Sequence, residues 1–205
     1  MAKSNQELEV KFYLADIEAL RRKLEGLGAH LVQPHTYERN LRFDTPEGIL
    51  TQHQQVLRLR QDTANRLTYK GPSQVKDGVS ARTEIEFIVG DFENAQKLFE
   101  ALGYQINMVY EKYRTVYDLN GTLVTLDEMP FGNFAEIEGS DGASIQAVCH
   151  RIGLMWELRT LQSYTQLFQI VKQNLGLTLR DLTFENFTGI RVGPSHLELA
   201  PADIA

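Results

Sequence analysis

The chain alternates between apolar and polar residues over many short stretches, which is the pattern of β-strands. Successive side chains of a strand point to opposite faces, so a two-residue period separates an apolar face from a charged one. The turn dipeptide Asn120-Gly121 indicates a tight hairpin. The pattern predicts strands near residues 6–14, 35–44, 55–62, 66–71, 80–89, 106–119, 122–128 and 133–138.

Between these strands, apolar residues recur with the period of helices. Asp16 is a suitable N-cap for a helix that carries one apolar face and ends near Leu27, just before Gly28. A second helix is predicted from about Phe92 to Leu102. Two more helices are expected at 142–153 and 161–175.

After Phe187 the chain contains Gly and Pro and few periodic apolar residues. We therefore expect a single domain over residues 1–187, followed by a loosely attached tail over residues 188–205. A chain of 205 residues is long enough for one sizeable domain of this kind.

The order strand, helix, strand, hairpin occurs twice, and short motifs match between the two halves. Glu7-Leu8-Glu9 matches Glu84-Ile85-Glu86, and Tyr37-Glu38-Arg39 matches Tyr110-Glu111-Lys112. The hairpin of the first half is basic and that of the second half is acidic. This repetition predicts an α+β fold with a closed antiparallel sheet, a pseudo-twofold internal repeat and flanking helices.

Composition narrows the function classes. The net charge of −6 argues against broad binding to nucleic acid or to a membrane surface. The sequence shows no signal peptide and no apolar run long enough to span a bilayer, so we expect a cytoplasmic protein. The single cysteine, Cys149, is expected to be a buried thiol rather than a nucleophile.

Carboxylates recur at every second position of several predicted strands. Crowded carboxylates repel one another, so a cavity that they share requires cations, and hard oxygen ligands favour Mg²⁺ or Mn²⁺. Ordinary solvated strand faces or cross-strand salt bridges are the alternative interpretation. The acidic set is Glu7, Glu9, Glu84, Glu86, Asp127, Glu136 and Glu138.

Basic residues follow the same alternation. Arginine binds phosphate oxygens through two parallel hydrogen bonds, and lysine adds a point charge, so such a set suits a polyanion with several phosphates. If the acidic and basic faces converge, they line a hydrated cavity that holds cations on one wall and phosphates on the other. The basic set is Lys11, Arg58, Arg60, Lys70, Arg82, Lys112 and Arg114.

The ordered set of motifs resembles the CYTH superfamily, whose members are also called triphosphate tunnel metalloenzymes. The superfamily includes class IV adenylate cyclases, thiamine triphosphatases, inorganic triphosphatases and, more distantly, fungal RNA triphosphatases. The closest likeness is to prokaryotic members labelled class IV adenylate cyclase. The matching motifs are Glu7-x-Glu9-x-Lys11, Arg58-Leu59-Arg60, Leu67-Thr68-Tyr69-Lys70-Gly71-Pro72, Arg82-Thr83-Glu84-Ile85-Glu86, Glu111-Lys112-Tyr113-Arg114 and the segment from Leu126 to Glu138.

The resemblance implies an eight-stranded antiparallel β-tunnel, a requirement for Mg²⁺ or Mn²⁺ and a small-molecule triphosphate substrate. The metal ligands or their close supports would be Glu7, Glu9, Asp127, Glu136 and Glu138. The phosphate-binding residues would be Lys11, Arg58, Arg60, Lys70, Arg82, Lys112 and Arg114. The residues expected to act in catalysis are Glu9, Glu136 and Lys70, while Glu84 and Glu86 complete the tunnel lining.

Three functions remain open at this point. A triphosphate phosphohydrolase is favoured, because water is a less demanding nucleophile to position than a ribose hydroxyl. A class IV adenylate cyclase that converts ATP to cyclic AMP and pyrophosphate is the alternative, and a non-catalytic polyphosphate- or nucleotide-binding module is the second. No nucleic-acid or membrane partner is expected, and a homodimer is left open. Many members carry an aromatic pair before Asp-Thr-Pro, whereas this chain has Arg42-Phe43; Arg42 either adds positive charge or faces solvent.

Overall fold

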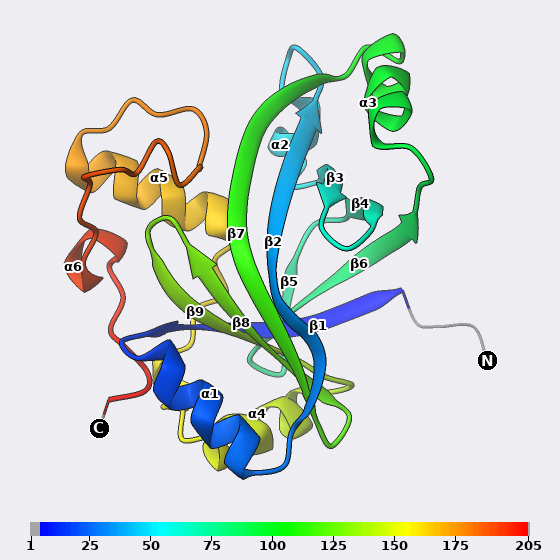
Figure 1. The fold of residues 1–205 in the computed structure, drawn as a ribbon. Coiled ribbons are helices and arrows are strands. Elements are labelled where there is room, and N and C mark those ends of the chain that lie inside the picture. The colour runs from blue at the N-terminus through cyan, green and yellow to red at the C-terminus, as the bar shows by residue number, and fades with distance from the viewer. Residues whose placement is uncertain (1–4, 205) are drawn as a thin grey trace.

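A closed ring of antiparallel strands dominates the structure, a computed structural model that describes residues 5–204 (Figure 1). The strand order is β1-β9-β8-β7-β2-β3-β4-β6-β5, and an additional pairing between β1 and β6 closes the ring. Among the described residues, β5 stands outside the ring and pairs with β6 alone. The strands are β1 (Gln6–Leu14), β2 (His30–Asp44), β3 (Val56–Gln61), β4 (Asn65–Lys70), β5 (Gln74–Lys76), β6 (Val79–Ile88), β7 (Gln105–Leu119), β8 (Thr122–Met129) and β9 (Gly132–Glu138).

The helices lie outside this ring, which gives an α+β fold with a tunnel through the sheet (Figure 1). The helix α1 begins after Asp16, whose side chain caps it by accepting a hydrogen bond from the Ala19 N–H at 2.9 Å. The helices are α1 (Ile17–Gly26), α2 (Ile49–Gln52), α3 (Phe92–Ala101), α4 (Gly142–Arg151), α5 (Tyr164–Leu175) and α6 (Pro194–Leu197), with a short 3₁₀ turn at Trp156–Leu158. None of the helices in residues 5–204 combines the length and the apolar character that a bilayer crossing requires.

Apolar side chains pack between the outer face of the sheet and the helices. In β1, Val10 and Phe12 point outward and are buried with residues of α1 and α4. A second cluster, which includes Phe168 and Leu182, lies beneath α5, and a third joins Leu41 and Leu59 to Phe99 of α3. The hydrophobic core is therefore outside the ring, and the inward faces of the strands are left to polar residues.

The sequence pattern predicted most strands and helices to within a few residues. The Asn120-Gly121 hairpin is confirmed: both residues have positive φ angles, 58° and 83°, which a two-residue hairpin loop favours. The strand expected at 35–44 begins earlier, at His30 in β2, because the pairing with β7 resumes on both sides of Pro34 through register shifts. Short elements without a periodic signal, namely α2, β5 and α6, were not predicted.

The segment after Phe187 was expected to be a loosely attached tail, and this expectation is wrong. Leu197 and Ala202 are fully buried, and the Ala202 N–H donates to the Tyr13 carbonyl at 2.9 Å. The carboxylate of Asp203 accepts hydrogen bonds from the backbone N–H groups of Ala15 and Asp16, both at 2.8 Å. The segment 188–204 is thus attached by apolar packing, with Ile190, Val192, Leu197 and Leu199 in the cluster beneath α5, and by the hydrogen bonds of Ala202 and Asp203 to the end of β1. Ala205 lies outside the described residues.

One of the proposed matches between the two halves fails. Tyr37 is 40% exposed on the outer face of β2, whereas Tyr110 on β7 is buried with its hydroxyl toward the tunnel. Because a shift of one residue moves a strand side chain to the other face, these two tyrosines are not equivalent. The pseudo-twofold repeat as a whole stays a prediction.

Candidate functional site

The tunnel holds a polar cavity of about 490 Å³. Strand alternation places its lining, since charged residues two apart in sequence share the inward face. All of the sequence-predicted site residues except Asp127 line it: Glu7, Glu9, Lys11, Arg58, Arg60, Lys70, Arg82, Glu84, Glu86, Lys112, Arg114, Glu136 and Glu138. The ring therefore brings together side chains from six strands that are far apart in the sequence.

Glu7 on β1 is the acceptor for two cations. The Lys70 ammonium lies 2.8 Å from Glu7 Oε1, and Arg82 Nε lies 3.0 Å from Glu7 Oε2. Burial alone would raise the pKa of Glu7, but Lys70 and Arg82 outweigh it and hold the pKa well below its usual value. Arg82 also reaches Glu9 at 3.4 Å. This part of the tunnel is an ionised network of lysine, arginine and glutamate.

Two neighbouring carboxylates, Glu84 and Glu138, are compensated less completely, although Lys70 lies 3.3 Å from Glu84. Burial together with the charges of Glu7, Glu9 and Glu84 raises the pKa of Glu138 to about 7. Burial and the proximity of Glu7 likewise raise the pKa of Glu84 to about 7, against the opposing effect of Lys70. More negative charge is therefore gathered here, on β1, β6 and β9, than the neighbouring cations neutralise.

Glu136 on β9 joins a second network. The Lys11 ammonium lies 2.8 Å from Glu136 Oε1, and Arg114 also donates to the Glu136 carboxylate. Although burial would raise the pKa of Glu136, these two cations hold it well below its usual value. The Lys11 ammonium also lies 4.8 Å from the centre of the Tyr164 ring at the start of α5, so its position is fixed from two sides.

The arginines of β3 are held by side chains of β4, β6 and β7. Arg58 donates to the Tyr110 hydroxyl at 3.1 Å and to the Thr68 hydroxyl at 3.0 Å. Arg60 contacts the Glu86 carboxylate at 3.2 Å. Both guanidinium groups are therefore oriented by neighbouring strands before any ligand arrives.

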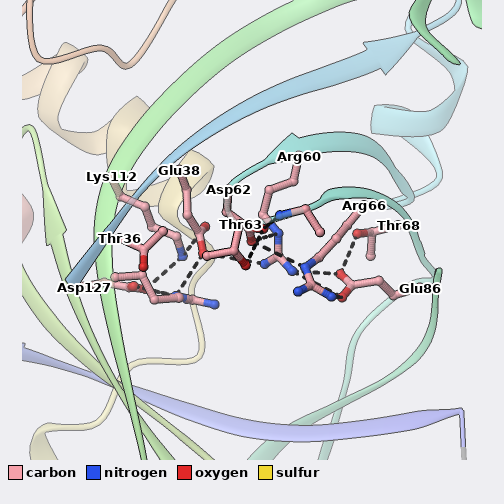
Figure 2. Close-up of polar contacts among 12 residues, drawn as sticks. Thr36, Glu38, Arg60, Asp62, Thr63, Arg66, Thr68, Glu86, Lys112 and Asp127 are labelled. Atoms are coloured by element: carbon pink, nitrogen blue, oxygen red, sulfur yellow. Dashed lines mark hydrogen bonds and ion pairs between the residues drawn. The ribbon is translucent and has the colours of Figure 1, made fainter. Parts of the chain in front are cut away.

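Glu38 is a site residue that the sequence motifs did not predict. Its carboxylate is completely buried and lies 3.7 Å from Lys112, 3.7 Å from Arg60 and 3.9 Å from Arg114. Figure 2 shows Glu38 between Lys112 and Arg60. Burial would raise the pKa of Glu38, but Lys112, Arg114 and Arg60 together lower it. The polar residues Glu38, Asn40 and Arg42 alternate along β2, and this alternation could have predicted that they share the inward face.

Asp127 on β8 lies behind the cavity lining. It is completely buried, and its carboxylate accepts hydrogen bonds from Lys112 at 3.0 Å, Arg114 at 2.7 Å and the Tyr164 hydroxyl at 2.8 Å. Three donors occupy its oxygens, so Asp127 orients the two cations that face the cavity.

The expected separation into an acidic and a basic wall is only partly realised. Lys11, Lys70 and Arg82 stand among the carboxylates, and cross-strand ion pairs connect the two kinds of charge. The charged residues of the sheet thus both line a shared cavity and form cross-strand salt bridges. Within residues 5–204, no three His, Cys, Asp or Glu side chains converge in a geometry that could hold a metal ion.

Arg42 lines the cavity, so of the two expectations for this residue the structure supports added positive charge in the tunnel. Burial lowers the pKa of Arg42, and the nearby charges of Arg58 and Arg82 act in the same direction. Its position on the inward face follows from its neighbours Leu41 and Phe43, which are buried on the outer face near α3.

Comparisons with known proteins agree with this architecture. The family model described as the CYTH domain matches residues 5–147. The adenylate cyclase CyaB of Aeromonas hydrophila is 30% identical over 135 residues, which are 64% of this chain and 67% of that protein.

Solved structures show the same fold. A protein of Pyrococcus horikoshii is 30% identical, with a TM-score of 0.65 over 78% of this chain and 98% of that one. A Hippeastrum protein described as revealing a dominant triphosphatase activity is 20% identical, with a TM-score of 0.60 over 95% of this chain and 100% of that one. At that identity, the second likeness concerns the fold alone.

Proposed function

Because the chain belongs to the CYTH domain family, we propose that it is a divalent-metal-dependent enzyme that hydrolyses triphosphate compounds inside its tunnel. The substrate class is an inorganic, thiamine or nucleoside triphosphate. The observation that carries this proposal is the cavity lining, in which eight arginines and lysines are interleaved with six glutamates. A protein that only bound polyphosphate would need the cations but would have little use for the carboxylates.

The carboxylates of the lining suit Mg²⁺ or Mn²⁺ by their chemistry, although within residues 5–204 their positions do not converge on one ion. Carboxylate oxygens are the ligands that these hard cations prefer. The raised pKa values of Glu84 and Glu138, both about 7, show uncompensated negative charge on this side of the tunnel, which a cation would neutralise. We propose Glu7, Glu9, Glu136 and Glu138 as the holding residues. Asp127 is a close support, because Lys112, Arg114 and Tyr164 occupy its oxygens.

The ion pairs of the tunnel suggest how substrate and metal bind together. Glu136 holds Lys11 and Arg114, and Glu7 holds Lys70 and Arg82. A triphosphate offers stronger anionic partners to these cations, so its arrival releases carboxylate oxygens for the metal. A bound divalent ion supplies neutralisation of the phosphate charge that grows in the transition state.

The chain's own residues then have distinct tasks. The cations hold and orient the phosphate oxygens, which is most of what phosphoryl transfer requires of a protein. Glu9 or Glu136 orients the attacking water, and Lys70 neutralises charge beside them. The phosphate-binding residues are Lys11, Arg58, Arg60, Lys70, Arg82, Lys112 and Arg114, with Glu84 and Glu86 completing the lining.

An adenylate cyclase is the second candidate, favoured by the 30% identity to the CyaB protein of Aeromonas hydrophila. In that case the 3′-hydroxyl of ATP attacks the α-phosphorus and pyrophosphate leaves, whereas in hydrolysis water attacks the terminal phosphorus and the shortened phosphate chain leaves. The relatives support both reactions equally. We place hydrolysis first because water is a less demanding nucleophile to position than a ribose hydroxyl.

A product assay separates the candidates. ATP, thiamine triphosphate and tripolyphosphate are incubated with Mg²⁺ or Mn²⁺, and phosphate, pyrophosphate and cyclic AMP are quantified. We expect phosphate release that EDTA abolishes and added metal restores. Cyclic AMP with equimolar pyrophosphate would establish the cyclase instead, and binding without any product would leave the non-catalytic module.

Glu136→Gln tests the assignment of the site. We expect it to abolish turnover because it removes the charge that holds Lys11 and Arg114, and Glu9→Gln is expected to do the same. Glu93→Gln, on the exposed side of α3, is the matched control. Circular dichroism verifies the fold, and near-normal turnover of both tunnel variants at saturating metal contradicts the assignment.

A further inference from the structure

Arg42 differs from the other cations of the cavity. Each of the other seven basic lining residues has at least one carboxylate within 4.0 Å. Within residues 5–204, the guanidinium of Arg42 has no ion pair and no side-chain hydrogen bond, although it is only partly exposed. A partly buried charge without a partner is costly, which points to a ligand from solution.

The neighbouring acceptors are already occupied. Asp44, two residues along β2, accepts hydrogen bonds from the N–H groups of Thr45, Leu50 and Thr51 and from the Thr51 hydroxyl, at distances of 2.6 to 3.0 Å. The Tyr110 hydroxyl accepts from Arg58 at 3.1 Å. Asp44 therefore attracts Arg42 only from beyond ion-pair distance, while Arg58 and Arg82 repel it.

The backbone fixes the direction of Arg42. It pairs with Arg58 across the β2–β3 ladder, so the two side chains share the inward face. Leu41 and Phe43 on either side are buried on the outer face. The β2–β7 register also shifts between Arg42 and Phe43, and such irregularities in a ladder re-aim side chains.

Arg42 extends the basic lining in one direction along β2. The inward row of this strand runs from Glu38 beside Lys112, through Asn40 beside Arg60, to Arg42 beside Arg58. At the rise of a strand, Arg42 lies about 13 Å from Glu38 along the backbone. Tripolyphosphate is longer than pyrophosphate by one phosphate unit, so its terminal phosphate extends farther along this row toward Arg42.

We propose that Arg42 and Arg58 form a phosphate subsite at the end of the basic row, and that this subsite makes the tunnel select a three-phosphate chain over a two-phosphate chain. The inference rests on the proposed function for its ligand class. It assigns a specificity role to Arg42, a basic lining residue that has no ion pair within residues 5–204. The arginine fork suits the several oxygens of a terminal phosphate.

The test compares tripolyphosphate with pyrophosphate by isothermal titration calorimetry in EDTA, which leaves binding to the protein's own side chains. We expect Arg42→Gln to weaken tripolyphosphate binding by roughly tenfold or more and pyrophosphate binding by less than about threefold. Arg42→Lys retains the charge but not the fork, so an intermediate loss is expected. Arg39→Gln, on the opposite face of β2, is the charge-matched control and is expected to preserve the ratio of the two affinities.

The outcomes separate this inference from the proposed function. Equal weakening of both ligands by Arg42→Gln, or no weakening, overturns the subsite even if the enzyme hydrolyses triphosphate. Failure of the wild-type protein to bind tripolyphosphate overturns it as well. Binding that depends on Arg42 without phosphate release under Mg²⁺ supports the subsite and removes hydrolysis.

Discussion

Replacing Glu38 by Gln removes the one carboxylate that lies between Lys112, Arg60 and Arg114. The change keeps the shape of the side chain and deletes its charge. At separations of 3.7 to 3.9 Å, each of the three attractions is worth about 4 kcal/mol before desolvation is subtracted. Since breaking a buried ion pair by removing one partner costs about 3–5 kcal/mol net, we expect Glu38→Gln to lower the free energy of unfolding by that amount.

Thermal unfolding followed by circular dichroism measures this loss. For a chain of this size, about 3–5 kcal/mol corresponds to a fall in Tm of roughly 6–20 °C. Glu47→Gln, which removes the same charge from an exposed position, is the matched control and is expected to leave Tm almost unchanged. Tripolyphosphate can replace the missing anion, so it is expected to raise the Tm of Glu38→Gln more than that of the wild-type protein.

The effect also has a defined pH dependence. The folded-state pKa of Glu38 is lowered, so its stabilising contribution is fully present above the unfolded value of 4.5 and is lost as the pH falls through the folded pKa. The Tm difference between wild type and Glu38→Gln is therefore expected to be constant near neutral pH and to shrink below pH 4.5. A Tm for Glu38→Gln within a degree or two of wild type at neutral pH would refute the reasoning.

Two further predictions concern the tunnel and the tail. Arg58→Ala and Arg60→Ala are expected to weaken triphosphate binding by at least roughly tenfold and monophosphate binding far less, because each variant loses a charge-assisted contact worth about 1.5–3 kcal/mol. Small and equal effects in calorimetry would instead make these arginines structural. Asp203→Ala is expected to lower stability by about 0.5–1.5 kcal/mol, because the exposed N–H groups of Ala15 and Asp16 exchange their carboxylate acceptor for water. An unchanged Tm would show that these two hydrogen bonds add no stability.

The strands of the ring could be predicted because strand alternation and turns are visible in the sequence. Alternation places Glu7, Glu9 and Lys11 on one face of a strand, wherever that strand ends up. The turn at Asn120-Gly121 and the caps of the helices are equally local. The candidate site could be predicted for the same reason: its residues occupy inward positions of strands, and their motifs occur in a recognisable order.

The role of Glu38 could not be predicted from its local sequence. Its neighbours along the chain, Tyr37 and Arg39, point to the other face, and Pro34 interrupts the pattern just before it. Asp127 was grouped with the acidic residues, but its burial behind Lys112 depends on α5, which contributes Tyr164 from much later in the chain. The tail was misjudged because its apolar residues, such as Leu197 and Leu199, follow no helix or strand period, and they pack against the cluster beneath α5 that only the tertiary structure assembles.

The sequence by itself determined which side chains face the tunnel, because the period of a strand is a property of the local backbone. Only the tertiary structure decided how their charges pair, because partners such as Lys70 and Glu7 are 63 residues apart and meet through closure of the ring. That pairing leaves Glu138 and Glu84 with raised pKa values and, within residues 5–204, leaves Arg42 without an ion pair. Electrostatic interactions depend on distance in space and on burial, and neither quantity can be read from positions along the chain.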